Sequence, residues 1–269
     1  MAGETRADEG LRRLRAESDA VCGEIAQLGA DDWDRPTNCD PWTLRVLVAH
    51  VVRGGESYLT SLERGRRGNL EPALTREQRA QRMQEIAAQP TDKIISDLRA
   101  MTDRFEREFR ALIPDQLDVL AMHPYGPRPA RWFIEQRLAE VAFHRWDFHN
   151  SLGRAASLDE DTAAYLLPLL FGKNLPVMMG SDGPRGEGSF KFAVRGSRQA
   201  WQAVAGPGSM TVSRDAGSAV DVTMEGDAAS LALLIYGRHT LAELDRSGKI
   251  TVSGNRELAG RFNEIFRGP

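Results

Sequence analysis

The sequence has few cysteines, no long apolar run and no excess of charge of either sign. Its two cysteines, Cys22 and Cys39, are too few for a disulfide scaffold or a cysteine metal cluster, so we expect two free thiols. Apolar runs such as Leu231 to Tyr236 are far shorter than the roughly 20 residues of a membrane-spanning helix. With 35 basic and 38 acidic side chains the net charge is −3, which gives no reason to expect a nucleic-acid or membrane partner.

The N-terminal segment also lacks a feature. Met1 to Arg15 is rich in charge and has no apolar stretch of the kind found in secretory signals, so we expect a cytoplasmic protein. Lysine is scarce beside arginine, a usage typical of GC-rich genomes. The remaining composition is ordinary for a globular protein, and 269 residues suffice for one large domain or two.

The first half of the chain has the pattern of long helices. Helical segments are predicted over residues 11–28, 40–64, 75–112 and 131–152. In the third, Pro90 is expected to separate a short helix from a longer one that starts near Thr91. Asp40 and Pro41 are expected to begin the second segment as its N-cap and first-turn proline, and Gly153 is expected to end the last. Short links between four main helices predict an antiparallel four-helix bundle.

Beyond Gly153 glycines become frequent, and short β-branched runs alternate with helical ones, which predicts a smaller α+β domain. Strands are expected near residues 190–194, 201–205, 210–213, 220–224 and 249–252. Helices are expected near residues 159–171, 227–236 and 255–266. We therefore predict two domains, residues 1–155 and 156–269, with the helix at about 159–171 as a linker.

Glu140 and His144 stand four residues apart on the last helix of the bundle, so their side chains share one face and can share one metal ion. At about 100° per residue, Arg137 and Asp147 fall in the same arc, whereas His149 points to the opposite side. Two interpretations of the arc stay open. It is either a solvent-exposed stripe or one wall of a functional site.

His50 is predicted to lie on the side of the second helix that faces the bundle interior, where an imidazole needs a polar partner. It is either a hydrogen-bonded core histidine or a metal ligand. Together with Glu140 and His144 it would supply two imidazoles and one carboxylate. These are the ligand types of an open catalytic Zn²⁺ site, in which a fourth position is left for water or substrate.

Two motifs resemble a known family. The segments DPWTLRVLVAH, residues 40–50, and EVAFHRWD, residues 140–147, resemble the DinB-like superfamily and, within it, the mycothiol-dependent maleylpyruvate isomerase family. The resemblance covers roughly residues 8–155. It implies a bundle in which His50, Glu140 and His144 bind a divalent metal, usually zinc.

The second half is similar to the sterol-carrier-like domain that is common in these proteins, through VDVTMEGD at residues 220–227 and the Gly237-Arg238 pair. In the isomerase an arginine of this domain serves the active site, and Arg238 is the matching position. A Gly-Arg pair after a helix is equally an ordinary C-terminal cap with a solvated charge.

These resemblances imply a metal-dependent enzyme that activates mycothiol, a thiol of actinobacteria, for addition to a small electrophilic metabolite. The addition would lead either to S-transfer or to cis–trans isomerisation of the maleylpyruvate type. Two alternatives come from other classes: a lipid or small-molecule binding protein with a structural bundle, and a thiol-independent metal hydrolase. The residues that contact the thiol, and the choice between monomer and dimer, stay open.

Several other polar and aromatic residues have more than one interpretation. Cys39 is either a nucleophile or a loop thiol, and because no histidine lies near it in the sequence a loop thiol is expected. His123 either lines the mouth of the pocket or is a solvated loop histidine, which is the expectation, and His239 is expected to be exposed. Asp147 is either an acceptor for a ligand imidazole or one more solvated charge. Core packing, or the floor of a substrate pocket, is expected for Trp42, Trp132 and Trp146.

Overall fold

The computed structural model describes residues 5–178, 186–206, 209–214, 217, 219–266 and 268. The chain divides into two compact units, residues 1–156 and residues 157–269. We call them the helical unit and the mixed unit. The predicted α+β fold class, with a helical first part and a mixed second part, is confirmed. Two glycines of the predicted glycine-rich stretch, Gly180 and Gly183, lie outside the described residues.

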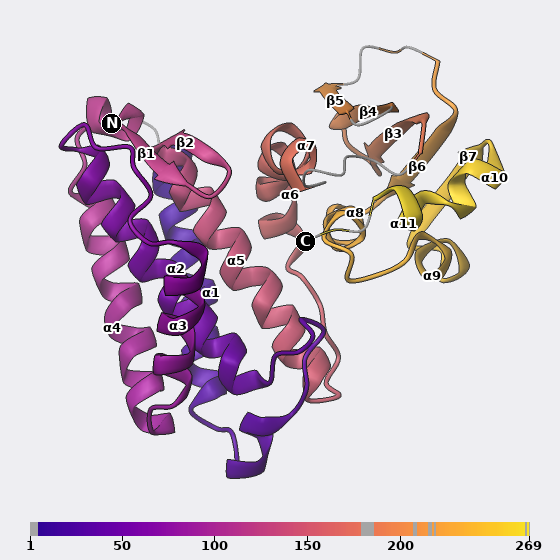
Figure 1. Cartoon of the computed structure of the whole chain (residues 1–269). Helices are drawn as coiled ribbons and strands as arrows, with labels where there is room; N and C mark the ends of the chain where they lie inside the picture. The colour runs from indigo at the N-terminus through magenta and orange to yellow at the C-terminus, as the bar shows by residue number, and fades with distance from the viewer. Residues whose placement is uncertain are drawn as a thin grey trace. The chain divides into compact units, whose positions relative to one another are not determined.

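Four long helices build the helical unit: α1 (Arg6–Ile25), α2 (Leu44–Gly65), α4 (Thr91–Arg110) and α5 (Ala130–Ser151). Helices α1 and α2 each pack against both α4 and α5, which closes a four-helix bundle (Figure 1). The shorter helix α3 (Arg76–Ala87) packs on α2. Two 3-10 turns, Ala30–Asp34 and Pro114–Asp118, lie in the connections.

Local signals in the sequence fix several helix ends. Thr5 and Asp8 form a reciprocal capping box at the start of α1. Gly153, with φ +66°, follows α5 and lets its own amide donate to the carbonyl of Asn150, as predicted for a C-terminal cap.

The predicted start of α2 is wrong. Asp40 is not the N-cap, because the backbone folds into a turn in which the amide of Trp42 donates to the carbonyl of Cys39 and the amide of Thr37 to that of Trp42. Asp40-Pro41 is a cis peptide inside this turn. The helix begins only at Leu44, after Thr43 in the N-cap position.

Helix α2 is continuous through two adjacent glycines, and both are sites of close helix approach. A β-carbon at Gly54 would overlap the carboxylate of Glu140 on α5. A β-carbon at Gly55 would overlap the thioether of Met101 on α4. The glycine pair therefore lets α2 lie close to both of its neighbours in the bundle.

A two-stranded hairpin that the sequence did not predict precedes α5. Strands β1 (Leu120–His123) and β2 (Gly126–Pro129) pair antiparallel, with His123 opposite Gly126, whose φ is +93°. Strand β1 packs on α2. A β-carbon at Gly65 would overlap the backbone of β1, so this glycine allows the hairpin to lie against the end of the helix.

The mixed unit is built on a five-stranded sheet in the order β5-β4-β3-β6-β7 (Figure 1). Its strands are β3 (Gly188–Val194), β4 (Ala200–Gly206), β5 (Ser209–Arg214), β6 (Val222–Gly226) and β7 (Ile250–Gly254). The β3–β6 pair is parallel and the other pairs are antiparallel. Each predicted strand is present, with ends shifted by a few residues.

Short helices come before, between and after the strands along the chain: α6 (Glu160–Leu169), α7 (Leu175–Met178), α8 (Ala228–Ile235), α9 (Leu241–Arg246), α10 (Arg256–Gly260) and α11 (Phe262–Ile265). A π-helical turn, Leu170–Asn174, joins α6 to α7. The helix predicted at 159–171 thus runs on beyond its predicted end. The one predicted at 255–266 is two, because Arg261 leaves helical geometry with ψ near 1°.

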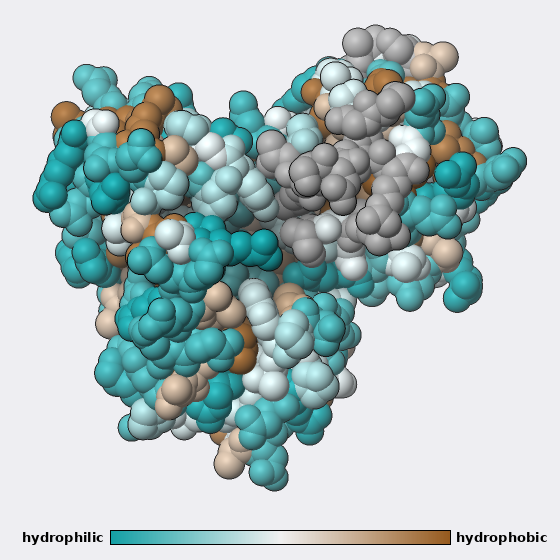
Figure 2. Space-filling view, in the orientation of Figure 1, coloured by the Kyte–Doolittle hydropathy of each residue, from teal (hydrophilic) through white to brown (hydrophobic). Residues whose placement is uncertain are grey.

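Apolar side chains are gathered inside each unit. Strand β3 alternates buried Phe190, Phe192 and Val194 with less buried residues, as a half-buried strand should. The face seen in Figure 2 is mainly hydrophilic, with small separate hydrophobic patches. Within the described ranges, no helix is long and apolar enough to cross a membrane.

Candidate active site in the helical bundle

His50 points from α2 into the bundle, as predicted. Its Nε2 lies 3.2 Å from Oε1 of Glu140, and its ring centroid lies 5.0 Å from that of His144 and 4.7 Å from that of Trp42. The guanidinium of Arg53 lies 3.1 Å from Nδ1. Because a guanidinium only donates, Nδ1 accepts here and Nε2 carries the proton toward Glu140. A metal ion on Nε2 would require the other tautomer, in which Nδ1 is protonated and no longer accepts from Arg53.

Burial controls the charge of this imidazole. It lowers the pKa of His50 to about 4, and the neighbouring carboxylate of Glu140 offsets only part of that shift. His50 is therefore uncharged at neutral pH. Only the neutral form of an imidazole can bind a metal ion.

Glu140 is held in place by a buried arginine one helical turn before it. Arg137, only 1% exposed, donates from Nη1 to Oε2 of Glu140 over 2.8 Å and to the carbonyl of Val51 on α2 over 2.7 Å. Burial raises the pKa of the Glu140 carboxyl, but the charge of Arg137 and the contact with His50 outweigh it, so the pKa lies well below its usual value. Glu140 is thus an oriented carboxylate.

The third residue of the predicted set, His144, is oriented by Asp147. Nδ1 of His144 lies 3.0 Å from Oδ2 of Asp147, whose side chain is fully buried. The thiol of Cys39 donates to the same oxygen over 3.4 Å. Asp147 is therefore an acceptor for this imidazole and not a solvated charge, which decides between the two interpretations offered by the sequence.

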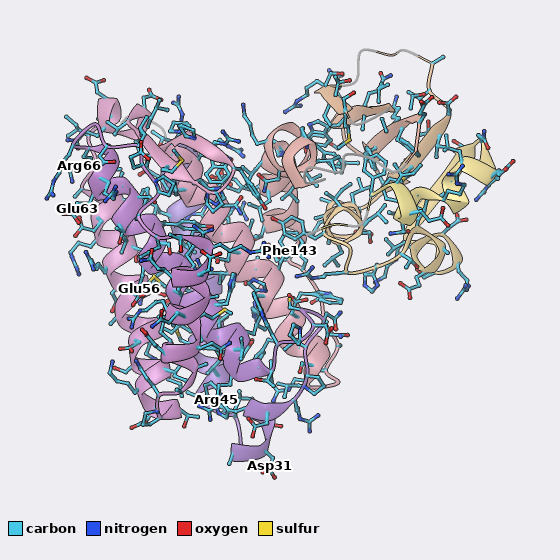
Figure 3. The ribbon with its side chains drawn as sticks, in the orientation of Figure 1. Asp31, Arg45, Glu56, Glu63, Arg66 and Phe143 are labelled. Atoms are coloured by element: carbon cyan, nitrogen blue, oxygen red, sulfur yellow. The ribbon has the colours of Figure 1, made fainter. Side chains whose placement is uncertain are left out.

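The polar arc of α5 faces the bundle interior and is not a solvent-exposed stripe. Helix α5 is apolar over most of its circumference, with buried Phe148 and with Phe143, labelled in Figure 3, also buried. His149 points away from the arc, as predicted, and its Nε2 lies 2.9 Å from Oε2 of Glu24 on α1. The arc residues Arg137, Glu140, His144 and Asp147 are therefore enclosed by the bundle.

Two donor sets that share His144 are candidates for a metal ion, and among the described residues only the second has all three ligand atoms within 4.8 Å of one another. The predicted set is His50, Glu140 and His144, in which the 3.2 Å between Nε2 of His50 and Oε1 of Glu140 is close to the roughly 3.3 Å expected between two ligands of one tetrahedral Zn²⁺. The other set is Cys39, His144 and Asp147, whose ligand atoms all lie within 4.8 Å of one another. The residue types of both sets are those that zinc accepts.

Cys39 is a free thiol in a loop, as predicted, and this loop places it beside the site. The turn at residues 39–42 brings it to α5 across more than 100 positions of sequence. Its spacing from His144 carries no periodic signal, because a loop and not a helix places it. Trp42, at the other end of the same turn, could have indicated that the turn lies at the site, since its ring packs on that of His50.

His123 is buried, and the expectation of a solvated loop histidine is wrong. Its ring in β1 packs against Trp132 at 4.6 Å, Tyr125 at 4.8 Å and Tyr58 at 5.7 Å between centroids. Burial lowers the pKa of His123 to about 3, and the amide of Tyr125 donates to its Nδ1 over 3.2 Å. The unpredicted hairpin is what encloses it.

Arg238, the expected substrate-binding arginine, lies in the mixed unit directly after α8. Its amide donates to the carbonyl of Leu233 and its Nη1 to that of Tyr236, and Gly237 before it has φ +68°. This is the C-terminal cap that the sequence offered as one interpretation. A role toward substrate stays a prediction. His239 beside it is partly buried, with Nδ1 3.6 Å from Oε2 of Glu243.

Comparison with protein families decides the membership. The model of the mycothiol maleylpyruvate isomerase N-terminal domain matches residues 14–149, which is half of the chain. The chain belongs to this family. The model of the SCP-2 sterol transfer family matches residues 185–267. Both resemblances predicted from the sequence motifs are therefore confirmed.

Individual proteins that this chain resembles are only distantly similar to it in sequence. Two uncharacterised proteins of Mycobacterium tuberculosis match part of the chain. One is 28% identical over 145 residues, which cover 54% of this chain and 68% of the relative. The other is 27% identical over 153 residues, which cover 52% of this chain and 55% of the relative. The crystal structure of the mycothiol-dependent maleylpyruvate isomerase matches with a TM-score of 0.68 over 92% of both chains at 17% identity. A histidine-to-alanine mutant of that enzyme gives 0.67. At such identity the likeness shows the fold.

Proposed function

We propose that this protein is a metal-dependent, thiol-using enzyme that activates mycothiol for addition to a small electrophilic metabolite. The outcome of the addition is S-transfer or cis–trans isomerisation of the maleylpyruvate type. The observation that carries the proposal is the meeting of His50 from α2 with Glu140 and His144 from α5 inside the bundle. Family membership supports the choice of thiol.

The proposed metal ligands are His50, Glu140 and His144. Two imidazoles and one carboxylate form a donor set of the open catalytic type, and zinc is the ion we expect. When bound, the ion would lower the pKa of a thiol that enters its open position and so supply a thiolate near neutral pH.

The surrounding residues orient this donor set. Asp147 accepts from Nδ1 of His144, which fixes the tautomer and leaves Nε2 to face the site. Arg137 anchors one oxygen of Glu140 and ties it to the backbone of α2, so the other oxygen is presented toward His50. Both supports are buried, which keeps the donors in place without a solvent competitor.

The test is turnover of maleylpyruvate with and without mycothiol, with metal content measured on the same samples. His50→Ala is expected to lose bound zinc and to reduce turnover by about 10³-fold or more. His149→Ala, on the side of α5 that contacts Glu24 of α1 and away from the proposed ligands, is the matched control and should keep both. Equal turnover by His50→Ala and the parent would reject the site.

The same experiment separates the two alternative classes. Turnover of an ester or amide substrate without any thiol would favour the metal hydrolase, and a metal-free parent that binds an apolar ligand would favour the binding protein. Arg238→Ala addresses the proposed substrate contact. We expect it to lower turnover by about tenfold to 100-fold while zinc content stays that of the parent, because the ligands all lie in the helical unit.

A further inference from the structure

Three different ligand types meet on the Asp147 side of His144. Sγ of Cys39 lies 3.4 Å from Oδ2 of Asp147, and Nδ1 of His144 lies 3.0 Å from the same oxygen. One ligand atom from each residue lies within 4.8 Å of the other two. Sulfur, nitrogen and oxygen ligands of one tetrahedral ion lie roughly 3.3–3.6 Å apart. The first two separations are already close to these values, so the three side chains nearly form a ligand set.

The loop that carries Cys39 is fastened to α5 by two further hydrogen bonds. Nδ2 of Asn150 donates to Oδ1 of Asn38 over 2.7 Å, and Oγ of Ser151 donates to the carbonyl of Pro36 over 2.6 Å. These contacts hold the backbone before the thiol against the end of the helix, and the turn described above fixes the backbone after it. The thiol is therefore presented to α5 by a segment that is tied down on both sides.

The burial of the three side chains suits a cation that enters from solvent. Asp147 is fully buried, whereas the side chain of His144 is 14% exposed and Cys39 is partly exposed. The carboxylate accepts the S–H of Cys39 and the N–H of His144 on one oxygen. A cation would replace both donors: the thiol proton leaves to solvent, and the imidazole proton moves from Nδ1 to Nε2.

His144 also belongs to the donor set of His50, Glu140 and His144, which we call the His50 set, but through its other ring nitrogen. A neutral imidazole has one nitrogen free to bind a metal ion and one that carries a proton. An ion on Nδ1 therefore puts the proton on Nε2, and an ion on Nε2 puts the proton on Nδ1, toward Asp147. The two sets cannot be filled together while the ring keeps its proton.

The thiol decides which ions this second set prefers. A thiolate is a soft ligand and favours thiophilic ions such as Cu⁺ and Cd²⁺, whereas the His50 set has only nitrogen and oxygen donors. We propose that Cys39, His144 and Asp147 form a site for a thiophilic cation. Its occupation would exclude zinc from the His50 set, because the ring of His144 serves both. The exclusion of zinc rests on the proposed function, and the binding of the thiophilic cation does not.

The experiment is a titration of the full-length protein, after dialysis against EDTA, with Cd²⁺ as the probe. Binding is followed by the ultraviolet charge-transfer absorbance of cadmium bound to a thiolate. We expect a single Cd²⁺ to bind with this absorbance and with release of a proton. Cys39→Ser should abolish the absorbance, and Asp147→Asn should weaken Cd²⁺ binding about tenfold or more because a charged oxygen ligand is lost. Circular dichroism checks that each variant is folded.

Cys22→Ser is the matched control, because Cys22 is the other of the two cysteines and is buried in α1. It should keep the absorbance. His50→Ala should keep it as well, because that change disrupts the His50 set and leaves the three ligands of the thiophilic site in place. Absence of the absorbance in the folded parent, or its loss in Cys22→Ser but not in Cys39→Ser, would overturn the proposal.

A competition measurement tests the exclusion of zinc. In a parent loaded with zinc, Cd²⁺ that saturates the absorbance should displace the zinc, whereas Cys39→Ser should keep its zinc at the same Cd²⁺ concentration. Zinc retained by the parent alongside the full absorbance would overturn the exclusion. A parent that binds no zinc but shows the absorbance would reject the proposed function and support the site for a thiophilic cation.

Discussion

The imidazole of His123 is enclosed by the rings of Tyr58, Tyr125 and Trp132, and the folded protein cannot easily protonate it. Burial lowers its pKa from 6.5 to about 3, whereas an unfolded chain would protonate it near the ordinary value. Between these two values the unfolded state binds more protons than the folded state. Stability therefore falls as the pH is lowered through this window and is unaffected by this group above it.

We predict that His123→Phe flattens the acid dependence of stability. The parent should lose up to about 1.4 kcal/mol for each pH unit between pH 6.5 and 4 on account of this residue, and the variant should lack that contribution. Urea unfolding at a series of pH values measures it. Since His50 titrates in the same window in both proteins, the difference between the two curves isolates His123. Parallel curves would contradict the prediction.

Gly54 lets α2 lie close to Glu140, a proposed ligand on α5. A β-carbon there would overlap the Glu140 carboxylate, and Arg137 prevents that carboxylate from moving away. We predict that Gly54→Ala lowers zinc affinity at least about tenfold and destabilises the protein by about 1–3 kcal/mol. Metal titration and thermal unfolding measure the two effects.

The control for this change is Gly23→Ala. Gly23 lies within α1 with no atom within 4 Å of an added β-carbon, so alanine there should stabilise the helix by about 0.5–1 kcal/mol and leave zinc affinity unchanged. If the two alanine variants bind zinc equally well, Glu140 is not constrained by Gly54 in the way that we describe.

At the scale of elements, the long helices and the strands of the mixed unit were predictable, and the loops that complete the site were not. Apolar periodicity placed His50 on the inner side of α2 because that signal repeats over several turns. The hairpin at β1 and β2 has only four residues in each strand, with Gly126 and two prolines in the second, too short and irregular for a period-two signal. The expectation that His123 is solvated was therefore wrong, and the position of Cys39 beside the site was not predicted.

Helix α8 begins with amides that are satisfied by a distant carboxylate. Oε1 and Oε2 of Glu160, in the first turn of α6, accept from the amides of Ala228 and Ala229 over 2.7 and 2.9 Å. A carboxylate at a helix N-terminus is stabilising through both the hydrogen bonds and the helix dipole. Glu160 thus fastens α6 to α8 inside the mixed unit.

We predict that Glu160→Gln destabilises the mixed unit by about 1 kcal/mol, because one amide loses its acceptor and the favourable charge is removed. Asp161→Asn, the next residue of α6, removes the same charge without a hydrogen bond to α8 and should cost much less. Chemical unfolding followed by the fluorescence of Trp201, in a protein whose other tryptophans are replaced by phenylalanine, reports on this unit. Equal losses in the two variants would show that only the charge matters.

At the scale of the whole molecule, every proposed ligand and support lies in the helical unit. All four of these residues, His50, Glu140, His144 and Asp147, fall within residues 1–156, and so do the residues described above as their partners. The sequence could identify this unit as the one with the chemistry because the two motifs lie at its two ends. It could not show which loop residues join them, since these contacts link distant segments without a repeat.

We therefore predict that a fragment of residues 1–156 folds and binds one zinc ion with an affinity within about threefold of that of the full chain, while turnover is lost if Arg238 serves the substrate. Circular dichroism and metal titration measure folding and binding. A fragment that is unfolded, or folded but unable to bind zinc, would show that the mixed unit is needed for more than the substrate.

Because the proposed site joins α2 to α5, it can form only late in the synthesis of the helical unit. His50 and Glu140 are separated by 90 positions, and Cys39 and Asp147 by 108. A nascent chain emerging from the ribosome has therefore released three of the four bundle helices long before any donor of α5 is available. On the proposed function, the set of donors is complete only after α5 has emerged, so metal would be loaded onto a chain whose other three bundle helices already exist.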